Sequence, residues 1–137
     1  MLPKPHDLHS LLIRTEFSND AAWEAVTAAV QAPVDGFRAN LNIVDDRRFD
    51  RLTIAQLLAL TSKAPEATFL FLVDSVTLES PEHPVLVVDV WEQPGRFFRV
   101  IPRQMWAVQN NLVIANVSWE DFADAVDADG VFRDPPR

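Results

Sequence analysis

Thr68-Phe-Leu-Phe-Leu-Val73 is apolar from its second residue onward and is followed by Asp74. A short apolar run without polar alternation is typical of a strand that is covered on both faces of a sheet. Val85-Leu-Val-Val88 has the same character, and Asp89 follows it. The sequence therefore predicts two buried strands in the interior of an α/β sheet.

Strands and helices alternate in the N-terminal half. Residues 11–17 begin with an apolar run and predict a strand. The polar residues 18–20 offer N-cap oxygens for a helix that ends before Pro33. Residues 37–44 alternate between apolar and polar side chains, as a half-buried strand does. The capping-box pattern Thr53-Ile-Ala-Gln56 then predicts a second helix.

The C-terminal half begins with a predicted hairpin. The turn residues Glu92-Gln-Pro-Gly95 separate the second buried strand from another strand over 96–101. Pro102 can open a helix, residues 112–115 predict a short strand, and Ser118-Trp-Glu-Asp121 resembles a capping box. The helix that it opens has an apolar stripe formed by Trp119, Phe122, Ala123 and Val126.

The predicted element order is β-α-β-α-β-β-β-α-β-α. Because the first half alternates strand and helix, we expect right-handed crossovers and parallel pairing there. The hairpin adds an antiparallel pair. The sequence thus predicts a single α/β domain over residues 1–137, with a mixed, mainly parallel sheet flanked by helices. We expect residues 1–8 and 131–137 to be loose ends.

Composition excludes several classes of protein. The 137 residues include no cysteine, so disulfides and thiolate chemistry are impossible. Only three glycines occur, and neither a dinucleotide fingerprint nor a phosphate loop can be drawn. The first residues lack the apolar region of a secretory signal, and no apolar run approaches the length of a membrane span. We therefore expect a cytoplasmic protein with no membrane association.

The charge also restricts the partners. The net charge is −8, and the arginines are scattered along the chain. Binding to nucleic acid depends on gathered lysine and arginine side chains that replace counterions, so we expect no nucleic-acid partner. An acidic surface suits solubility or a basic protein partner. The sequence leaves the oligomeric state open.

Aspartates follow or end several predicted strands. Asp45, Asp46 and Asp74 lie at strand ends, and Asp89 lies near another. In open α/β sheets, ligands bind outside the carboxyl ends of the strands. If the four carboxylates converge there, they are candidate ligands for Mg²⁺ or Mn²⁺. The alternative is that each aspartate hydrogen-bonds its local backbone, as strand-exit residues commonly do.

His83 is a candidate general acid or base. It lies in Ser80-Pro-Glu-His-Pro84, where two prolines flank an acid beside an imidazole. The alternative is a plain connecting loop.

The last predicted helix carries acids opposite its apolar stripe. Such a face can attract a basic partner by electrostatic steering, or it can simply be the solvated side of an amphipathic helix. The candidate partner-binding residues are Glu120, Asp121, Asp124 and Asp127.

Short segments spread over most of residues 2–132 together carry a family resemblance. They are Leu12-Ile-Arg-Thr15 with Phe17, Asp20-Ala-Ala-Trp23, Leu57-Leu-Ala-Leu60, Phe71-Leu-Val-Asp74, His83-Pro-Val-Leu-Val-Val-Asp89, Phe98-Arg-Val100, Met105-Trp106, Asn110-Asn-Leu112, Ile114-Ala-Asn116 and Phe122-Ala-Asp-Ala-Val-Asp127. With these segments the chain resembles a family of small uncharacterised actinobacterial proteins that is classed as a domain of unknown function. The resemblance implies a bacterial, cytoplasmic origin and supplies no catalytic residue.

Two functional hypotheses follow from the sequence. The first is a non-catalytic protein-binding accessory or immunity-type module that neutralises a basic partner. The second is a divalent-metal-dependent enzyme or ligand-binding protein that uses the strand-end aspartates. Self-association through tryptophan-bearing faces is compatible with either.

Overall fold

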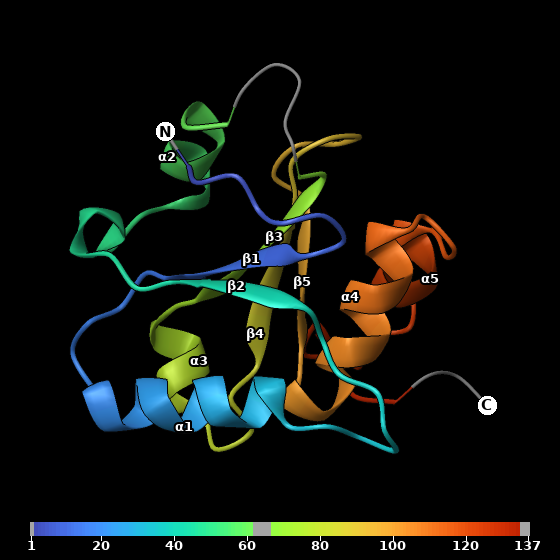
Figure 1. Cartoon of the computed structure of the whole chain (residues 1–137), viewed down its shortest axis with the longest axis horizontal. Coiled ribbons are helices and arrows are strands. Elements are labelled where there is room, and N and C mark those ends of the chain that lie inside the picture. The colour runs from blue at the N-terminus through green and yellow to red at the C-terminus, as the bar shows by residue number, and fades with distance from the viewer. Residues whose placement is uncertain (1, 62–66, 135–137) are drawn as a thin grey trace.

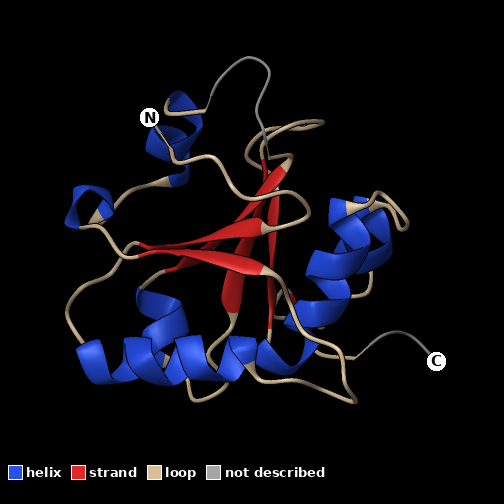
Figure 2. Cartoon of the chain, in the orientation of Figure 1, coloured by secondary structure: helices blue, strands red, loops and turns tan. Residues whose placement is uncertain are grey.

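The computed structural model describes residues 2–61 and 67–134. Its centre is a six-stranded sheet with the strand order β2-β1-β3-β4-β5-β6, and helices lie around it (Figures 1 and 2). The elements in chain order are β1 (Ser10–Arg14), α1 (Asp20–Gln31), β2 (Leu41–Val44), the 3₁₀ turn η1 (Arg47–Phe49), α2 (Ile54–Ala59), β3 (Phe69–Val73), α3 (Ser75–Glu79), β4 (Val85–Asp89), β5 (Phe97–Val100), the 3₁₀ turn η2 (Pro102–Gln104), α4 (Met105–Val113), α5 (Trp119–Ala123) and β6 (Val131–Phe132).

The sheet is mixed, as expected for this α/β chain. β1 pairs in parallel with both β2 and β3. β4 is antiparallel to β3 and to β5, so the predicted hairpin is confirmed, and β6 is parallel to β5. All strands except β4 therefore end at the same edge, which we call the carboxyl edge. β4 ends at the opposite edge, which we call the amino edge.

Two hydrophobic cores cover the two faces of the sheet. The first contains the buried stripe of α1 together with residues of α4 and α5, and the second contains Phe49 of η1 and Leu57 of α2. In Figure 1, α2 accordingly lies apart from α4 and α5. The α1 stripe is the predicted one, formed by Trp23, Val26 and Val30, and Asn19 caps the helix by accepting the Ala22 N–H.

The predicted strand over 112–115 is wrong, because Leu112 and Val113 are the last residues of α4. Met105, Val108 and Leu112 fall at i, i+3 and i+7, which places them on one face of a helix. The first two are buried in the first core, and Leu112 packs against it. The helical period therefore continues through a run that reads locally as a strand.

The C-terminal end also differs from expectation. The last helix ends at Ala123, with Asp124 as its C-cap. Val131 and Phe132 are not part of a loose end, since they pair with β5 and are buried. Phe132 belongs to the first core, so its burial supports the pairing. Residue 1 and residues 135–137 of the expected loose ends lie outside the described residues.

Two further elements differ from the sequence prediction. α3 was not expected; it begins at a capping box in which Asp74 accepts the Thr77 N–H. β2 begins at Leu41 rather than at residue 37. Phe37 instead bridges to Val34 and stacks on Trp106 with 4.7 Å between ring centroids.

Candidate functional site

The turn between β4 and β5 is organised by the carboxylate of Asp89. Asp89 is 3% exposed. Its Oδ1 accepts the backbone N–H groups of Trp91 and Glu92 at 2.8 and 3.2 Å. Its Oδ2 accepts the Gln93 N–H at 3.0 Å and the Arg96 Nε–H at 2.6 Å. The carboxylate thereby fixes the direction in which residues 91–93 leave the sheet.

Arg96 connects this turn to α5. Its Nη1 donates to Glu120 at 2.8 Å and its Nη2 donates to Glu92 at 3.2 Å, in addition to the bond with Asp89. The guanidinium lies 4.9 Å from the ring centroid of Trp119. Asp89 and Arg96 neutralise each other, so Glu92 and Glu120 leave a local charge of about −2.

Between the turn and α5 lies a hollow of about 430 Å³, which we call the amino-edge groove. Trp91 is 54% exposed at this groove, whereas Trp119 is 8% exposed. The groove combines an exposed aromatic ring, an acidic rim and an apolar end. It is lined by Thr68, Phe69, Asp89, Trp91, Glu92, Arg96, Leu112, Ala115, Val117, Ser118, Trp119 and Glu120.

Two acids of the groove, Asp89 and Glu120, have lowered pKa values. Burial raises the pKa of Asp89, but the hydrogen bonds from Trp91, Gln93 and Arg96 outweigh it and hold the pKa below its ordinary value. The hydrogen bond from Arg96 likewise lowers the pKa of Glu120. Asp89 and Glu120 therefore keep their negative charges to a lower pH than ordinary carboxylates do.

The structure does not bring the four predicted metal-binding aspartates together. Asp74 follows β3 and Asp45 follows β2 at the carboxyl edge, whereas Asp89 is paired with Phe69 at the amino edge. Asp89 does not meet the condition for a shared site, because β4 is antiparallel to its neighbours and ends at the other edge. Within residues 2–61 and 67–134, no group of three or more histidine, aspartate or glutamate side chains could hold a metal ion.

Each of these aspartates also has hydrogen-bond partners of its own. Asp45 accepts from Nη1 of the buried Arg14 at 3.3 Å. Asp46 caps the turn η1 through the Arg48 N–H and accepts from Arg48 Nε, both at 2.9 Å. Asp74 accepts hydrogen bonds from both terminal nitrogens of Arg99, at 3.0 and 2.7 Å. Asp46, Asp74 and Asp89 each accept a backbone N–H from a residue two or three positions later, as the alternative of local hydrogen bonding predicts.

His83 is held against α3. Its Nδ1 lies 2.9 Å from the Thr77 carbonyl oxygen, and its φ of +50° is in the left-handed region. A carbonyl can only accept, so Nδ1 carries the proton and Nε2 is the basic nitrogen of the neutral ring. The residue does not line the amino-edge groove.

The predicted acidic helix face is divided by the early end of α5. Glu120 lies on the rim of the groove and pairs with Arg96. Asp121 caps its own helix at Ser118, and Asp127 lies beyond the helix and pairs with Arg133. Asp124 is exposed. Sequence reasoning thus identified Glu120 and missed Trp91, Glu92 and Arg96 as parts of one site.

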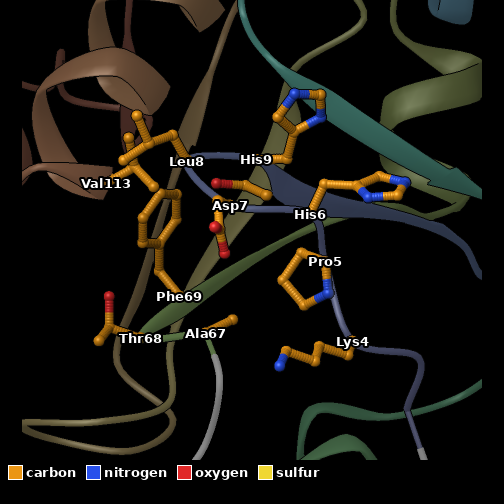
Figure 3. A pocket seen from close by; sticks show the side chains of 11 residues that line it. Lys4, Pro5, His6, Asp7, Leu8, His9, Ala67, Thr68, Phe69 and Val113 are labelled. Carbon is orange, nitrogen blue, oxygen red and sulfur yellow. The ribbon is translucent and has the colours of Figure 1, made fainter.

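A smaller pocket of about 190 Å³ lies where residues 4–10 pass the start of β3. In Figure 3, Phe69 and Val113 stand on the side opposite His6, and the rings of His6 and His9 lie toward β2. Asn42 of β2 holds this segment, because its Oδ1 accepts the backbone N–H of His6 at 2.7 Å and its Nδ2 donates to His9 Nδ1 at 3.0 Å. The Asn42 side chain thus attaches the N-terminal segment to β2 through the His6 backbone and the His9 ring.

The lowered pKa values predict the response to acid. Burial raises the pKa of Asp74, but Arg99 and Thr77 outweigh it, so both Asp74 and Asp89 have folded-state pKa values below the ordinary one. Their contribution to stability is complete above about pH 4 and is lost as the pH falls through the folded values. We expect the thermal midpoint to fall between about pH 5 and pH 2. The fall should be shallower in Asp74→Asn, and a midpoint that is flat over this range would contradict the prediction.

Comparison with known proteins places the chain in a family. The model of the family described as "Domain of unknown function (DUF6924)" matches residues 9–135. The chain belongs to this family. The DUF6924 match covers the whole sheet and both edges described above. No curated protein matches the chain. Among the residues that the structure describes, no helix has the length and apolar character needed to cross a membrane.

Proposed function

We propose that this DUF6924 chain is a non-catalytic binding module whose amino-edge groove receives a lysine or arginine side chain of a basic protein partner. The observation that carries the proposal is the exposed Trp91 ring beside the acids Glu92 and Glu120 in one hollow. An aromatic face and two carboxylates are the groups that bind a cationic side chain in proteins.

The interior of the groove already contains such an arrangement. Arg96 lies over the Trp119 ring and bonds to three carboxylates. Trp91 offers a second ring, which is exposed and has no ring or cation contact with any described residue. A cation over an indole ring contributes about 0.5–1 kcal/mol when exposed and about 2 kcal/mol when water is excluded.

The charge of the whole chain supports the same partner. A net charge of −8 attracts a basic protein from a distance and accelerates its association. The apolar end of the groove, at Leu112 and Val117, suits the hydrocarbon stem of a lysine or arginine. We extend the proposal to an accessory protein of the immunity type, on the grounds of its small size, its acidic charge and its lack of cofactor motifs. A bacterial, cytoplasmic origin is what the family resemblance implies.

The alternative of a divalent-metal-dependent enzyme has less support. It required the strand-end aspartates to share one site, and Asp89 lies at the other edge from Asp74. Asp74 is also engaged by both terminal nitrogens of Arg99. The binding module does not depend on aspartates from both edges of the sheet meeting at one site.

The proposal is tested by selecting peptides from a random phage-displayed library on the immobilised protein. We expect arginine or lysine to be enriched at one position of the selected sequences. The selected peptide, made synthetically, should bind Trp91→Ala at least tenfold more weakly than the wild type, as measured by calorimetry. Unchanged thermal midpoints will show that the variants are folded.

A charge-matched pair of double variants separates the groove from general attraction. Glu92→Gln/Glu120→Gln and Glu24→Gln/Asp124→Asn both change the net charge from −8 to −6. Glu24 and Asp124 are exposed and lie outside the groove. We expect the first pair to weaken peptide binding much more than the second. Equal effects, or selected peptides without basic residues, would refute the proposal.

A further inference from the structure

A second pocket lies at the carboxyl edge, where the chain changes direction across the sheet. After β1 the chain crosses to β2 through α1, and it returns past β1 to β3 through α2. α1 packs in the first core and α2 in the second, so these two helices cover opposite faces of the sheet. The helices that follow the carboxyl ends of β1 and β3, α1 and α3, both pack in the first core. Thr15 and Asp74, which directly follow these two strands, line a pocket on the other face beside the start of α2. The ends of strands at this edge are where α/β sheets commonly bind ligands.

The pocket at this edge has a volume of about 220 Å³, which corresponds to about seven water molecules. Ile54, Leu72 and Phe97 provide apolar walls, and Thr15, Asp74 and Arg99 provide polar groups. Phe97 is 59% exposed although it is a large aromatic residue on a strand. The pocket therefore joins an apolar wall to a charged group, as small-molecule sites generally do.

Arg99 is fixed in place and retains donors. Its Nη1 donates to Asp74 and to the Pro84 carbonyl, and its Nη2 donates once to Asp74. Nε and the second proton of Nη2 donate to no described residue. These two donors lie along one side of the planar guanidinium and match the two oxygens of a carboxylate.

The geometry points to a binding site for a small organic carboxylate with an apolar body in this pocket. The carboxylate accepts from the Nε and Nη2 edge of Arg99, and the apolar body lies against Ile54, Leu72 and Phe97. Because Asp74 and Pro84 already hold the guanidinium, binding costs little side-chain entropy. Asp74 shares the same cation and repels a second carboxylate, so we expect weak affinity. This inference does not depend on the amino-edge groove.

The test is a heteronuclear NMR titration of the full chain with acetate, isovalerate and benzoate. Benzamide, which has the shape of benzoate without its charge, is the control ligand. We expect benzoate to perturb the amides of Thr15, Phe97 and Arg99 and to bind at least fivefold more tightly than benzamide. Perturbation centred on Trp91, equal binding of benzoate and benzamide, or no perturbation by any carboxylate would overturn the inference.

Two variants locate the site. Arg99→Gln removes the guanidinium and should abolish the preference for benzoate over benzamide. Because this change also leaves Asp74 without its partner, Ile54→Trp provides an independent test that fills the pocket and keeps the ion pair. Ala55→Trp is its matched control, since Ala55 is exposed and does not line the pocket. We expect loss of benzoate binding in Ile54→Trp and retention in Ala55→Trp; equal binding by these two variants would place the ligand elsewhere.

Discussion

Asp89→Ala is expected to lower the free energy of unfolding by about 3–5 kcal/mol, because it removes one partner of a buried ion pair. Asp89 is 3% exposed. Without its carboxylate, the Arg96 Nε–H and the N–H groups of residues 91–93 lose their acceptor. The same substitution should release the turn that carries Trp91, so the groove is expected to lose its shape as well.

Urea unfolding followed by far-UV circular dichroism measures this loss. Asp124→Ala is the matched control, because Asp124 is an exposed aspartate outside the groove. We expect this control to change the free energy of unfolding by no more than about 0.5 kcal/mol. Similar values for the two variants would mean that Asp89 contributes only charge and does not organise the turn.

Phe71→Ala is expected to destabilise the protein by about 3–5 kcal/mol through the cavity that it leaves. Phe71 lies in the middle of β3, is fully buried, and packs edge-on against Phe69 with 5.5 Å between ring centroids. Strands on both sides of β3 prevent the backbone from closing over the lost ring. Little relaxation is therefore possible.

Phe97→Ala on β5 is the natural comparison, because it makes the same chemical change at a ring that is 59% exposed. We expect a cost below about 1 kcal/mol there, since most of this ring is already in water. Chemical denaturation of the two variants under one set of conditions gives both values. A cost for Phe71→Ala near that of Phe97→Ala would contradict the assignment of β3 to the core.

Local patterns predicted the elements whose signals are complete within a few residues. The Asn19 cap, the Thr53 capping box and the reversal at Glu92–Gly95 are of this kind, and each forms as the residues indicate. The direction of β4 is different, because an apolar run looks the same whichever way it is paired. The one indication of the direction of β4 is the length of the connection before it. Residues 74–84 are too few for an ordinary parallel crossover, so they favour antiparallel pairing.

The candidate site was harder to predict because it is assembled across the chain. Arg96 and Glu120 are 24 residues apart in sequence, and neither belongs to a recognisable motif. Trp91 reads as core material by composition, and its exposure depends on the turn that Asp89 fixes. Conversely, the prediction placed Asp124 and Asp127 on a helix face because it continued the helix past Ala123, where α5 ends.

The antiparallel course of β4 places Leu86 at the carboxyl-edge pocket and Asp89 at the amino-edge groove, three residues along one strand. The two hollows have no lining residue in common. Substitutions on the rim of one hollow can therefore accumulate without altering the walls of the other. Genetic variation among relatives is thus free to change one edge while the other is preserved, with the buried strand between them as the constraint on both.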